Sequence, residues 1–328
     1  MKYKWVSFYC GFFCGISVFA LPPKTSSPLH FKVQIENDLL VTPYNEDRDY
    51  TMGLKLISKG DWISNYRMDN PLKWANSWWS WLKPYQQSNQ QSVNLISETY
   101  TPDNLPESKP LHDDRPYASL ILIQWEKTEP LSKTFYLRSS FAFGALGLSI
   151  SKEAQRLVHA SARWGRKNSG LYNLVDHPKD PKGWGNQISN GGEPTGLYSI
   201  EVGKKIPMGL FVNHLFSRVS LGYQTKLDLG LSLQSTPFFQ TTESYCRIIG
   251  SWQITKPIYN SLLQGQFRAS PVTFSSNKLQ TFIYNGQLGV EINYQKYLLQ
   301  FSLNGKSPEI IGQSRRHYWG SLSVGYSP

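Results

Sequence analysis

Two polar clusters flank one connection near the start of the chain and bring oxygen-bearing side chains into close spacing. Glu36-Asn37-Asp38 ends one alternating segment, and the run from Asp47 to Thr51 begins the next. A hairpin between them would bring Asp38 near Thr51, so that carboxylate, amide and hydroxyl oxygens meet. Such oxygens suit a hard cation such as Ca²⁺. The alternative is a set of solvated turn residues, because Asp and Asn are common in turns.

A histidine is the natural candidate for a base that activates water, because the pKa of a free imidazole lies near neutral pH. His159 lies in "SKEAQRLVHASARW", residues 151–164, which we expect to form a helix with Ser151 as its N-cap. Gln155 and His159 are four residues apart, so they share one face of that helix. His112, which two aspartates follow, is the rival candidate. A histidine without a catalytic role is the alternative for either position.

A third polar segment is "LHDDRPYAS", residues 111–119, where Arg115 precedes a proline and the start of an alternating segment. We expect Arg115 to form a structural ion pair at the rim of a sheet, with phosphate binding as the alternative. The segment "KGWGNQISNGG", residues 182–192, predicts a tight turn, with an oxyanion-binding backbone as the alternative. No G-x-S-x-G or H-E-x-x-H pattern occurs in the sequence, so neither a serine nucleophile nor that type of zinc site has local support.

The elements that must position these residues are short alternating segments. Phe31, Val33 and Ile35 alternate with polar residues, which predicts a strand with apolar groups toward lipid and polar groups inward. The number of such segments predicts an all-β fold, a transmembrane antiparallel up-and-down β-barrel of about 12 strands, with a short helix in the long outward connection. The strands are expected at 29–39, 50–59, 92–100, 117–127, 133–144, 194–204, 214–223, 225–235, 245–257, 283–294, 297–305 and 317–326.

The composition agrees with a membrane barrel and excludes a disordered chain. Aromatic residues make up 14% of the 328 residues, and charged residues only 17%. The formal net charge of +11 favours anionic partners, and we expect phosphorylated lipid headgroups because no nucleic-acid module is recognisable.

The first 20 residues combine Lys2 and Lys4 with an apolar stretch, which predicts a cleaved secretory signal peptide. A single transmembrane helix is the alternative, although the stretch is short for one. A single barrel domain would then span residues 21–328. Cys246 would be its only cysteine, which leaves no internal disulfide and no cysteine metal site.

The connections between the expected strands are unequal in length. With both termini on the periplasmic side, the connections after the first, third and fifth strands face outward, and they are "LVTPYNEDRD", "TPDNLPESKPLHDDRP" and residues 145–193. These three carry most of the candidate residues. The inward connection, residues 60–91, contains "WANSWWSWLKPY". Its tryptophans predict either a short helix at the membrane interface or ordinary packing under the barrel.

Seven segments, in this order, resemble the outer-membrane lipid A 3′-O-deacylase family over nearly the whole mature chain: "ENDLL", "DRDYTMG", "TYTPDN", "DDRPYAS", "GALGLSISKEAQRLVH", "GWGNQI" and "YNSLLQG". The resemblance implies a twelve-stranded barrel in a bacterial outer membrane, inserted by the barrel-assembly machinery. It implies a substrate, lipid A or lipopolysaccharide, in the outer leaflet. It also implies Ca²⁺-dependent hydrolysis of the ester that holds the 3′-linked acyl (acyloxyacyl) group.

The resemblance also implies roles for individual residues. His159 matches the family's catalytic histidine, the base that takes a proton from water. Asn37 and Asp38 match a catalytic pair beside the metal, and Thr51 matches a hydroxyl residue near the reacting ester. The family has a functional lysine in the connection where Lys109 is the only lysine. The candidates for substrate binding are Lys109, Arg115 and Gln155.

Two other functions stay open from the sequence. One is an outer-membrane phospholipase, which shares the barrel, calcium and ester hydrolysis but usually relies on a serine nucleophile. The other is a non-catalytic channel or binding barrel whose polar rim selects ions. A channel would tolerate the loss of His159, whereas a deacylase would not.

Overall fold

The structure is a computed structural model that describes residues 30–41, 49–79, 90–156, 182–208, 211–241, 243–313 and 315–328. The expected signal peptide and His159 lie outside the described residues. No helix within these ranges has the length and apolar character needed to cross a membrane.

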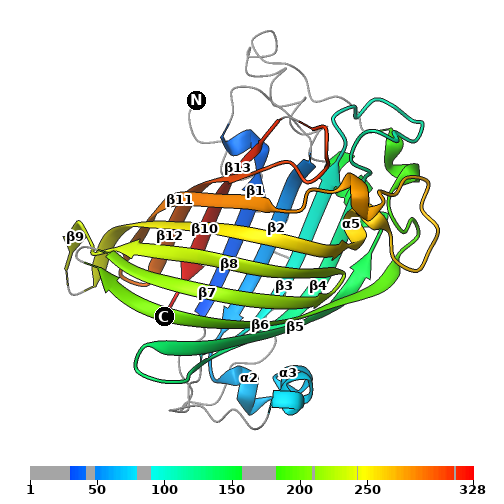
Figure 1. Ribbon diagram of the computed structural model, residues 1–328. Coiled ribbons are helices and arrows are strands. Elements are labelled where there is room, and N and C mark those ends of the chain that lie inside the picture. Colours follow the sequence, from blue (N-terminus) through cyan, green and yellow to red (C-terminus); the bar gives the residue numbers. More distant parts are fainter. Residues whose placement is uncertain are drawn as a thin grey trace.

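The described residues form a closed antiparallel β-barrel of twelve strands (Figure 1). Each strand pairs with the next along the chain, and β1 pairs with β13 to close the sheet, with Phe31 opposite Tyr326. A two-residue strand, β9, extends one hairpin. The strands are β1 (His30–Asn37), β2 (Asp49–Lys59), β3 (Gln90–Thr101), β4 (Ala118–Pro130), β5 (Phe135–Leu146), β6 (Glu193–Met208), β7 (Phe211–Gly222), β8 (Gln224–Ser235), β9 (Phe239–Gln240), β10 (Ser244–Asn260), β11 (Ile283–Tyr294), β12 (Tyr297–Lys306) and β13 (His317–Tyr326).

Alternation along each strand separates a lipid-facing surface from a lumen. In β1, Phe31 and Ile35 are exposed on the outer surface, whereas Lys32 and Gln34 bond to polar partners. Lys32 reaches across to Gln300 of β12, so the polar side of the strand faces the lumen. The predicted fold and the predicted orientation of β1 are therefore confirmed.

The two ends of the barrel differ in the length of their connections. At one end β6 and β7 are joined across two residues, and so are β11 and β12, although residues 60–89 form one long connection there. The other end carries residues 38–48, 102–117, 147–192, 261–282 and 307–316. Outer-membrane barrels have short periplasmic turns and long extracellular loops, so the long connections face the outside of the cell. The three predicted outward connections share that end with two more long connections and with the one-residue turn between β7 and β8.

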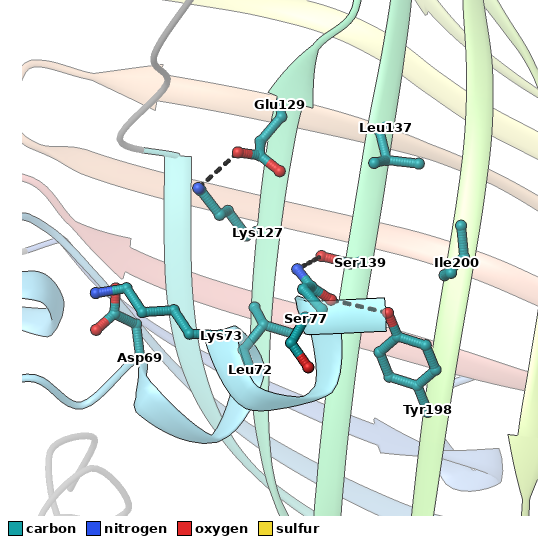
Figure 2. Close-up of a pocket in the computed structure, with 11 residues that line it drawn as sticks. Asp69, Leu72, Lys73, Ser77, Lys127, Glu129, Leu137, Ser139, Tyr198 and Ile200 are labelled. Atoms are coloured by element: carbon teal, nitrogen blue, oxygen red, sulfur yellow. Dashed lines mark hydrogen bonds and ion pairs between the residues drawn. The ribbon is translucent and has the colours of Figure 1, made fainter. Parts of the chain in front are cut away.

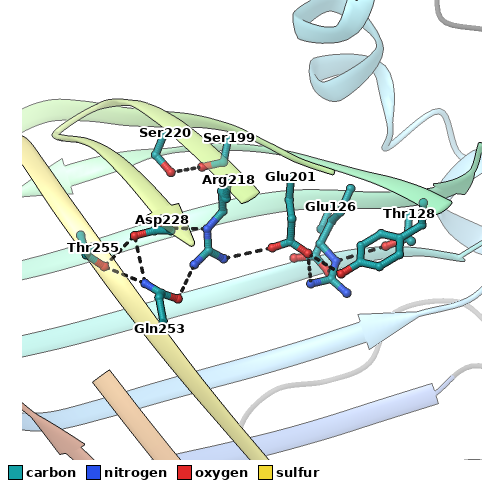
Figure 3. A network of polar contacts seen from close by, with 11 residues as sticks. Glu126, Thr128, Ser199, Glu201, Arg218, Ser220, Asp228, Gln253 and Thr255 are labelled. Atoms are coloured by element: carbon teal, nitrogen blue, oxygen red, sulfur yellow. Dashed lines mark hydrogen bonds and ion pairs between the residues drawn. The ribbon is translucent and has the colours of Figure 1, made fainter. Parts of the chain in front are cut away.

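Polar side chains cross the middle of the lumen (Figure 3). Arg218 bonds to Asp228 at 2.9 Å and to Glu201 at 3.5 Å, and Arg138 bonds to Glu201 at 3.1 Å. Asp228 is completely buried and Thr255 donates to it at 2.6 Å. This lumen network lies between two cavities of about 430 and 700 Å³, since three of its residues line both: Arg138, Glu201 and Arg218.

An apolar cluster fills the extracellular end of the lumen above that network. Its members come from β3, β4 and β5 and from the connections at that end, where Tyr223 and Leu262 contribute. Ser261 donates its backbone N–H to the Tyr223 carbonyl at 2.8 Å, which ties α5 (Ser261–Gln264) to the β7–β8 turn. The barrel is therefore packed at its extracellular end.

Short helices flank the barrel at both ends. At the periplasmic end, α2 (Trp62–Asn65), α3 (Asn70–Asn76) and the 3₁₀ turn η2 (Ser77–Trp79) follow β2. Residues 150–156 are helical in the long extracellular connection, which confirms the predicted helix over its described part. The predicted N-cap was wrong by two residues, because the N–H groups of Lys152 and Glu153 donate to the Ser149 carbonyl. The remaining 3₁₀ turns are η1 (Asp38–Leu40), η3 (Gly183–Asn186) and η4 (Ser276–Lys278).

Candidate active site

Asn37 and Thr51 meet on the outer surface of the barrel wall. Asn37 pairs with Met52 across the hairpin, and its Nδ2 donates to the Thr51 carbonyl at 3.0 Å. A β-bulge shifts the register of β2 against β3 between Tyr50 and Met52. The extra residue lets Tyr50 face the lumen while Thr51 faces outward, as bulges commonly re-aim a side chain. The hairpin therefore brings Asn37 of the first cluster against Thr51 of the second. The predicted approach of Asp38 to Thr51 stays a prediction.

The surface around Thr51 is polar and buried, where a lipid-facing wall is normally apolar and exposed. Thr51 Oγ1 lies 2.6 Å from Thr101 Oγ1 of β3. Thr99 and Ser119 continue the same outward side onto β3 and β4, and Thr99, Thr101 and Ser119 have at most 1% of their surface exposed. We call this surface the outer polar patch, defined by Asn37, Thr51, Thr99, Thr101 and Ser119. Asp38, which is 3% exposed, continues from Asn37 into η1.

The long connection after β5 covers part of the outer polar patch. Ser119 Oγ donates to the Leu148 carbonyl at 3.0 Å and to Gln187 Oε1 at 3.2 Å. Gly147 makes this approach possible, because its φ is +81° and a Cβ atom there would lie 2.1 Å from the Ser189 carbonyl oxygen. Both ends of residues 147–192 are thus fixed against β4.

The described part of the extracellular helix is anchored by Gln155. Its Oε1 accepts a hydrogen bond from Trp184 Nε1 at 2.8 Å, and both side chains are buried. Trp184 in turn packs on Tyr117, with ring centroids 4.7 Å apart. Gln155 therefore holds the helix beside the start of β4.

Arg115 and Glu36 lie on the lumen side of the wall instead. The Arg115 guanidinium is 3% exposed, stacks over the Tyr100 ring at 4.2 Å, and forms a short ion pair with Glu309. Glu36 accepts a hydrogen bond from Tyr50 at 2.6 Å and lines the lumen cavity of about 430 Å³. The triplet that ends β1 is therefore divided, with Glu36 inside the barrel and Asn37 outside.

The ion pair of Arg115 with Glu309 is buried at the extracellular end of the barrel. Burial alone would raise the pKa of the Glu309 carboxyl, but Lys306 and Arg115 together hold that pKa below its usual range. Lys306 Nζ lies 3.0 Å from Glu309 Oε1. Glu309 is therefore held as a carboxylate, and its contacts favour the structural role expected for Arg115.

The other candidates lie on the exposed surface of the extracellular loops. Lys109 is exposed, and its backbone N–H donates to Glu107 Oε1 at 2.9 Å. His112 is also exposed. Neither side chain belongs to the outer polar patch.

The donor chemistry at the end of β1 fits a calcium ion. The Nδ2 atom of Asn37 donates to the Thr51 carbonyl, so the Oδ1 atom of Asn37 points to the opposite side. Asp38, the next residue in the chain, adds a carboxylate. Amide, carboxylate and backbone oxygens are the ligands Ca²⁺ takes. Within the described ranges, no group of three or more His, Cys, Asp or Glu side chains could hold a metal. Asn37 and Asp38 would thus supply only part of a shell.

Three residues that position the site were not predicted. Thr101 is the partner of Thr51, Trp184 holds Gln155, and Glu309 holds Arg115. Trp184 lies in the segment for which a tight turn was predicted, and residues 183–186 do form a 3₁₀ turn. The one signal in that segment was a single tryptophan, Trp184, among small and polar residues, which could have indicated that its side chain packs against a neighbour.

Comparisons with known proteins identify the family of this chain and its fold. The family model described as outer membrane protein LpxR matches residues 8–327. Among solved structures, LpxR from Salmonella typhimurium aligns with a TM-score of 0.61 at 13% identity, covering 90% of this chain and 99% of that one. The β domain of the Bordetella autotransporter BrkA aligns with a TM-score of 0.45 at 8% identity, covering 92% and 99%. No curated protein sequence matches the chain. This chain belongs to the LpxR family of outer membrane proteins, the lipid A 3′-O-deacylases that its motifs resemble.

Proposed function

We propose that this deacylase hydrolyses the 3′-linked acyl (acyloxyacyl) ester of lipid A at the outer polar patch. The observation that carries the proposal is the patch itself, a buried polar surface on the outer side of a membrane-spanning wall. It lies near the extracellular end, at the level where the outer leaflet presents lipopolysaccharide. A buried polar surface there costs free energy unless it is satisfied, so a functional reason is expected.

His159 is the base in this mechanism. It takes a proton from a water molecule whose oxygen attacks the ester carbonyl, and it returns that proton to the sugar oxygen as the C–O bond breaks. The assignment of His159 rests on the family motif, and the predicted helix 151–164 would place His159 one turn after Gln155, which Trp184 anchors. Gln155 acts by positioning the helix, because its Oε1 is engaged by Trp184.

Asn37, Asp38 and Thr51 form the other half of the site. Asn37 and Asp38 would hold Ca²⁺, which supplies positive charge that stabilises an oxyanion. Asn37 also fixes the backbone of Thr51 through its 3.0 Å hydrogen bond. Thr51, held by Thr101, orients the ester.

The basic loop residues have lesser roles. Lys109 is exposed on the extracellular side, where it can reach a sugar phosphate of lipid A. Arg115 is engaged by Glu309 on the lumen side, so it supports the loop that carries Lys109.

The lumen argues against a channel. The lumen network lies between its two cavities, and the apolar cluster packs its extracellular end. A phospholipase remains the competing enzyme, and the substrate assay separates the two.

Mass spectrometry of lipid A from cells that express wild type, His159→Ala or His112→Ala tests the proposal. We expect wild type and the matched control His112→Ala to remove the 3′-linked acyloxyacyl group, and His159→Ala to leave it in place. Intact lipid A with wild type in the presence of calcium, together with fatty acid release from phospholipid, would establish the phospholipase instead.

A further inference from the structure

A third cavity lies outside the wall, at the end of the barrel opposite the outer polar patch. It measures about 250 Å³ and is formed where α3 packs against β4, β5 and β6 (Figure 2). Its wall residues lie on the outer side of their strands, because the alternate residues Glu126, Arg138 and Glu201 line the lumen. The cavity therefore opens toward the membrane near the periplasmic end and is unrelated to the outer polar patch.

The cavity is a built site held by hydrogen bonds between α3 and the wall. Asn76 Nδ2 donates to Ser139 Oγ at 2.7 Å, and the Tyr198 hydroxyl donates to Asn76 Oδ1 at 2.8 Å. Trp74 packs edge-on against Phe141 with ring centroids 6.2 Å apart, yet it remains 68% exposed. Exposed tryptophans at a barrel end mark the level of lipid headgroups.

The charged residues of the cavity form two ion pairs, so their formal charges sum to zero. Lys73 Nζ lies 2.8 Å from Asp69 Oδ2, and Lys127 Nζ lies 2.6 Å from Glu129 Oε1. Each ammonium group has three donors, so one ion pair leaves donors for a further acceptor. Two cations and two anions favour a zwitterionic ligand over one with a net charge.

One carboxylate oxygen of Asp69, a residue that lines the cavity, lacks a hydrogen-bond partner among the described residues. This atom is the buried Oδ1, and Asp69 is 4% exposed. An unsatisfied buried carboxylate oxygen costs free energy of about 1–3 kcal/mol or more, so a donor from a ligand would be stabilising there. A primary ammonium group supplies such a donor, whereas a quaternary ammonium group has none.

We propose that this cavity binds the headgroup of a zwitterionic phospholipid with a primary ammonium group, from the periplasmic leaflet. The ammonium donates to Asp69 Oδ1, and the phosphate accepts from Lys73 and Lys127. The start of the acyl chains lies along Leu137 and Ile200, which also line the cavity. The cavity volume is below the range of about 300–1,000 Å³ for drug-sized ligands, which suits a headgroup.

Native mass spectrometry of the purified full-length protein in detergent tests the proposal. Phosphatidylethanolamine, phosphatidylcholine and phosphatidylglycerol are titrated separately against wild type, Asp69→Asn and the control Glu243→Gln, an exposed acid at the same end. We expect wild type to retain phosphatidylethanolamine at least fivefold more strongly than the other two lipids. Asp69→Asn should lose that preference, and Glu243→Gln should keep it.

Folding and charge are controlled separately. Heat-modifiable electrophoretic mobility shows whether each barrel is folded, and Lys127→Gln provides a second variant that leaves the N-terminus of α3 unchanged. Lys127→Gln should weaken both phosphatidylethanolamine and phosphatidylcholine, because both carry the phosphate. Equal retention of all three lipids by folded wild type, or an unchanged preference in folded Asp69→Asn, would overturn the proposal.

Discussion

Glu36 and Asn37 are neighbours in β1, but they belong to two polar regions with opposite surroundings. Glu36 faces a lumen crossed by ion pairs. Asn37 belongs to the outer polar patch, where the contacts join hydroxyl, amide and backbone groups. The lumen network resembles the satisfied interior of a folded protein. The patch resembles a surface that is completed by a ligand. The comparison assigns stability to the first region and chemistry to the second.

Arg218→Ala should have the largest effect, and the effect should be on stability. It leaves the Asp228 and Glu201 carboxylates buried with fewer partners, which costs about 3–5 kcal/mol. We expect a lower urea midpoint in detergent, with the deacylation rate per folded molecule retained. Lys133→Ala, an exposed substitution in the β4–β5 turn, should leave the midpoint unchanged. A folded Arg218→Ala protein with no deacylase activity would contradict the assignment of stability to the lumen network and of chemistry to the outer polar patch.

Asp38→Asn should lower the deacylation rate strongly and should change the free energy of unfolding little. Asp38 would hold the Ca²⁺ whose positive charge stabilises the oxyanion, and loss of one group that stabilises an oxyanion typically costs about 10²–10³-fold in rate. The measurement is the rate of 3′-acyl release from purified lipid A at saturating calcium, with Asp113→Asn in an exposed loop as control. A rate for Asp38→Asn within about threefold of wild type would exclude Asp38 from the site.

Lowering the pH should destabilise the extracellular end through Glu309. Its pKa is lowered in the folded state, so its stabilising contribution is complete above the unfolded pKa of about 4.3 and is lost as the pH falls toward the folded value. Between these values the loss is about 1.4 kcal/mol per pH unit. Unfolding free energies from pH 7 to pH 3 should fall less steeply in Glu309→Gln than in wild type. Identical slopes would contradict the assignment.

Thr51→Val should have the smallest effect. It removes the hydroxyl that meets Thr101 but keeps the shape of the side chain, which costs about 1 kcal/mol of unfolding free energy. The deacylation rate of Thr51→Val should also fall, because Thr51 orients the ester. Thr51→Ser, which restores the hydroxyl, should recover most of the rate. Full activity in Thr51→Val would show that the hydroxyl has no part in the reaction.

The fold was largely predictable because each wall strand carries its own alternating pattern. Strands β11 and β13 have the predicted bounds, and the other ten wall strands differ by a few residues at their ends, whereas the two-residue β9 was not predicted. The site was less predictable for a physical reason. Regular alternation from Gly53 would place the Thr51 side chain in the lumen. The bulge turns that side chain outward instead, and no local sequence pattern predicts the bulge.

Long-range partners were beyond the sequence as well. Glu309 is 194 positions from Arg115, and no spacing rule joins residues of separate loops. Gln155 was a candidate for substrate binding, but its hydrogen bond to Trp184 favours a positioning role. His159 and its role stay a prediction from the family motif, because His159 lies outside the described residues.

The most direct test of the two-region account uses two amide side chains of the same strand. Asn37 faces the outer polar patch, and Gln34 faces the lumen, where its Nε2 donates to Glu36. The rates of 3′-acyl release are measured for folded, purified Asn37→Ala and Gln34→Ala. The account predicts a loss of about 100-fold or more for Asn37→Ala, as for other groups beside an oxyanion, and a rate within about twofold of wild type for Gln34→Ala. Equal losses in the two variants, or a larger loss for Gln34→Ala, would contradict it.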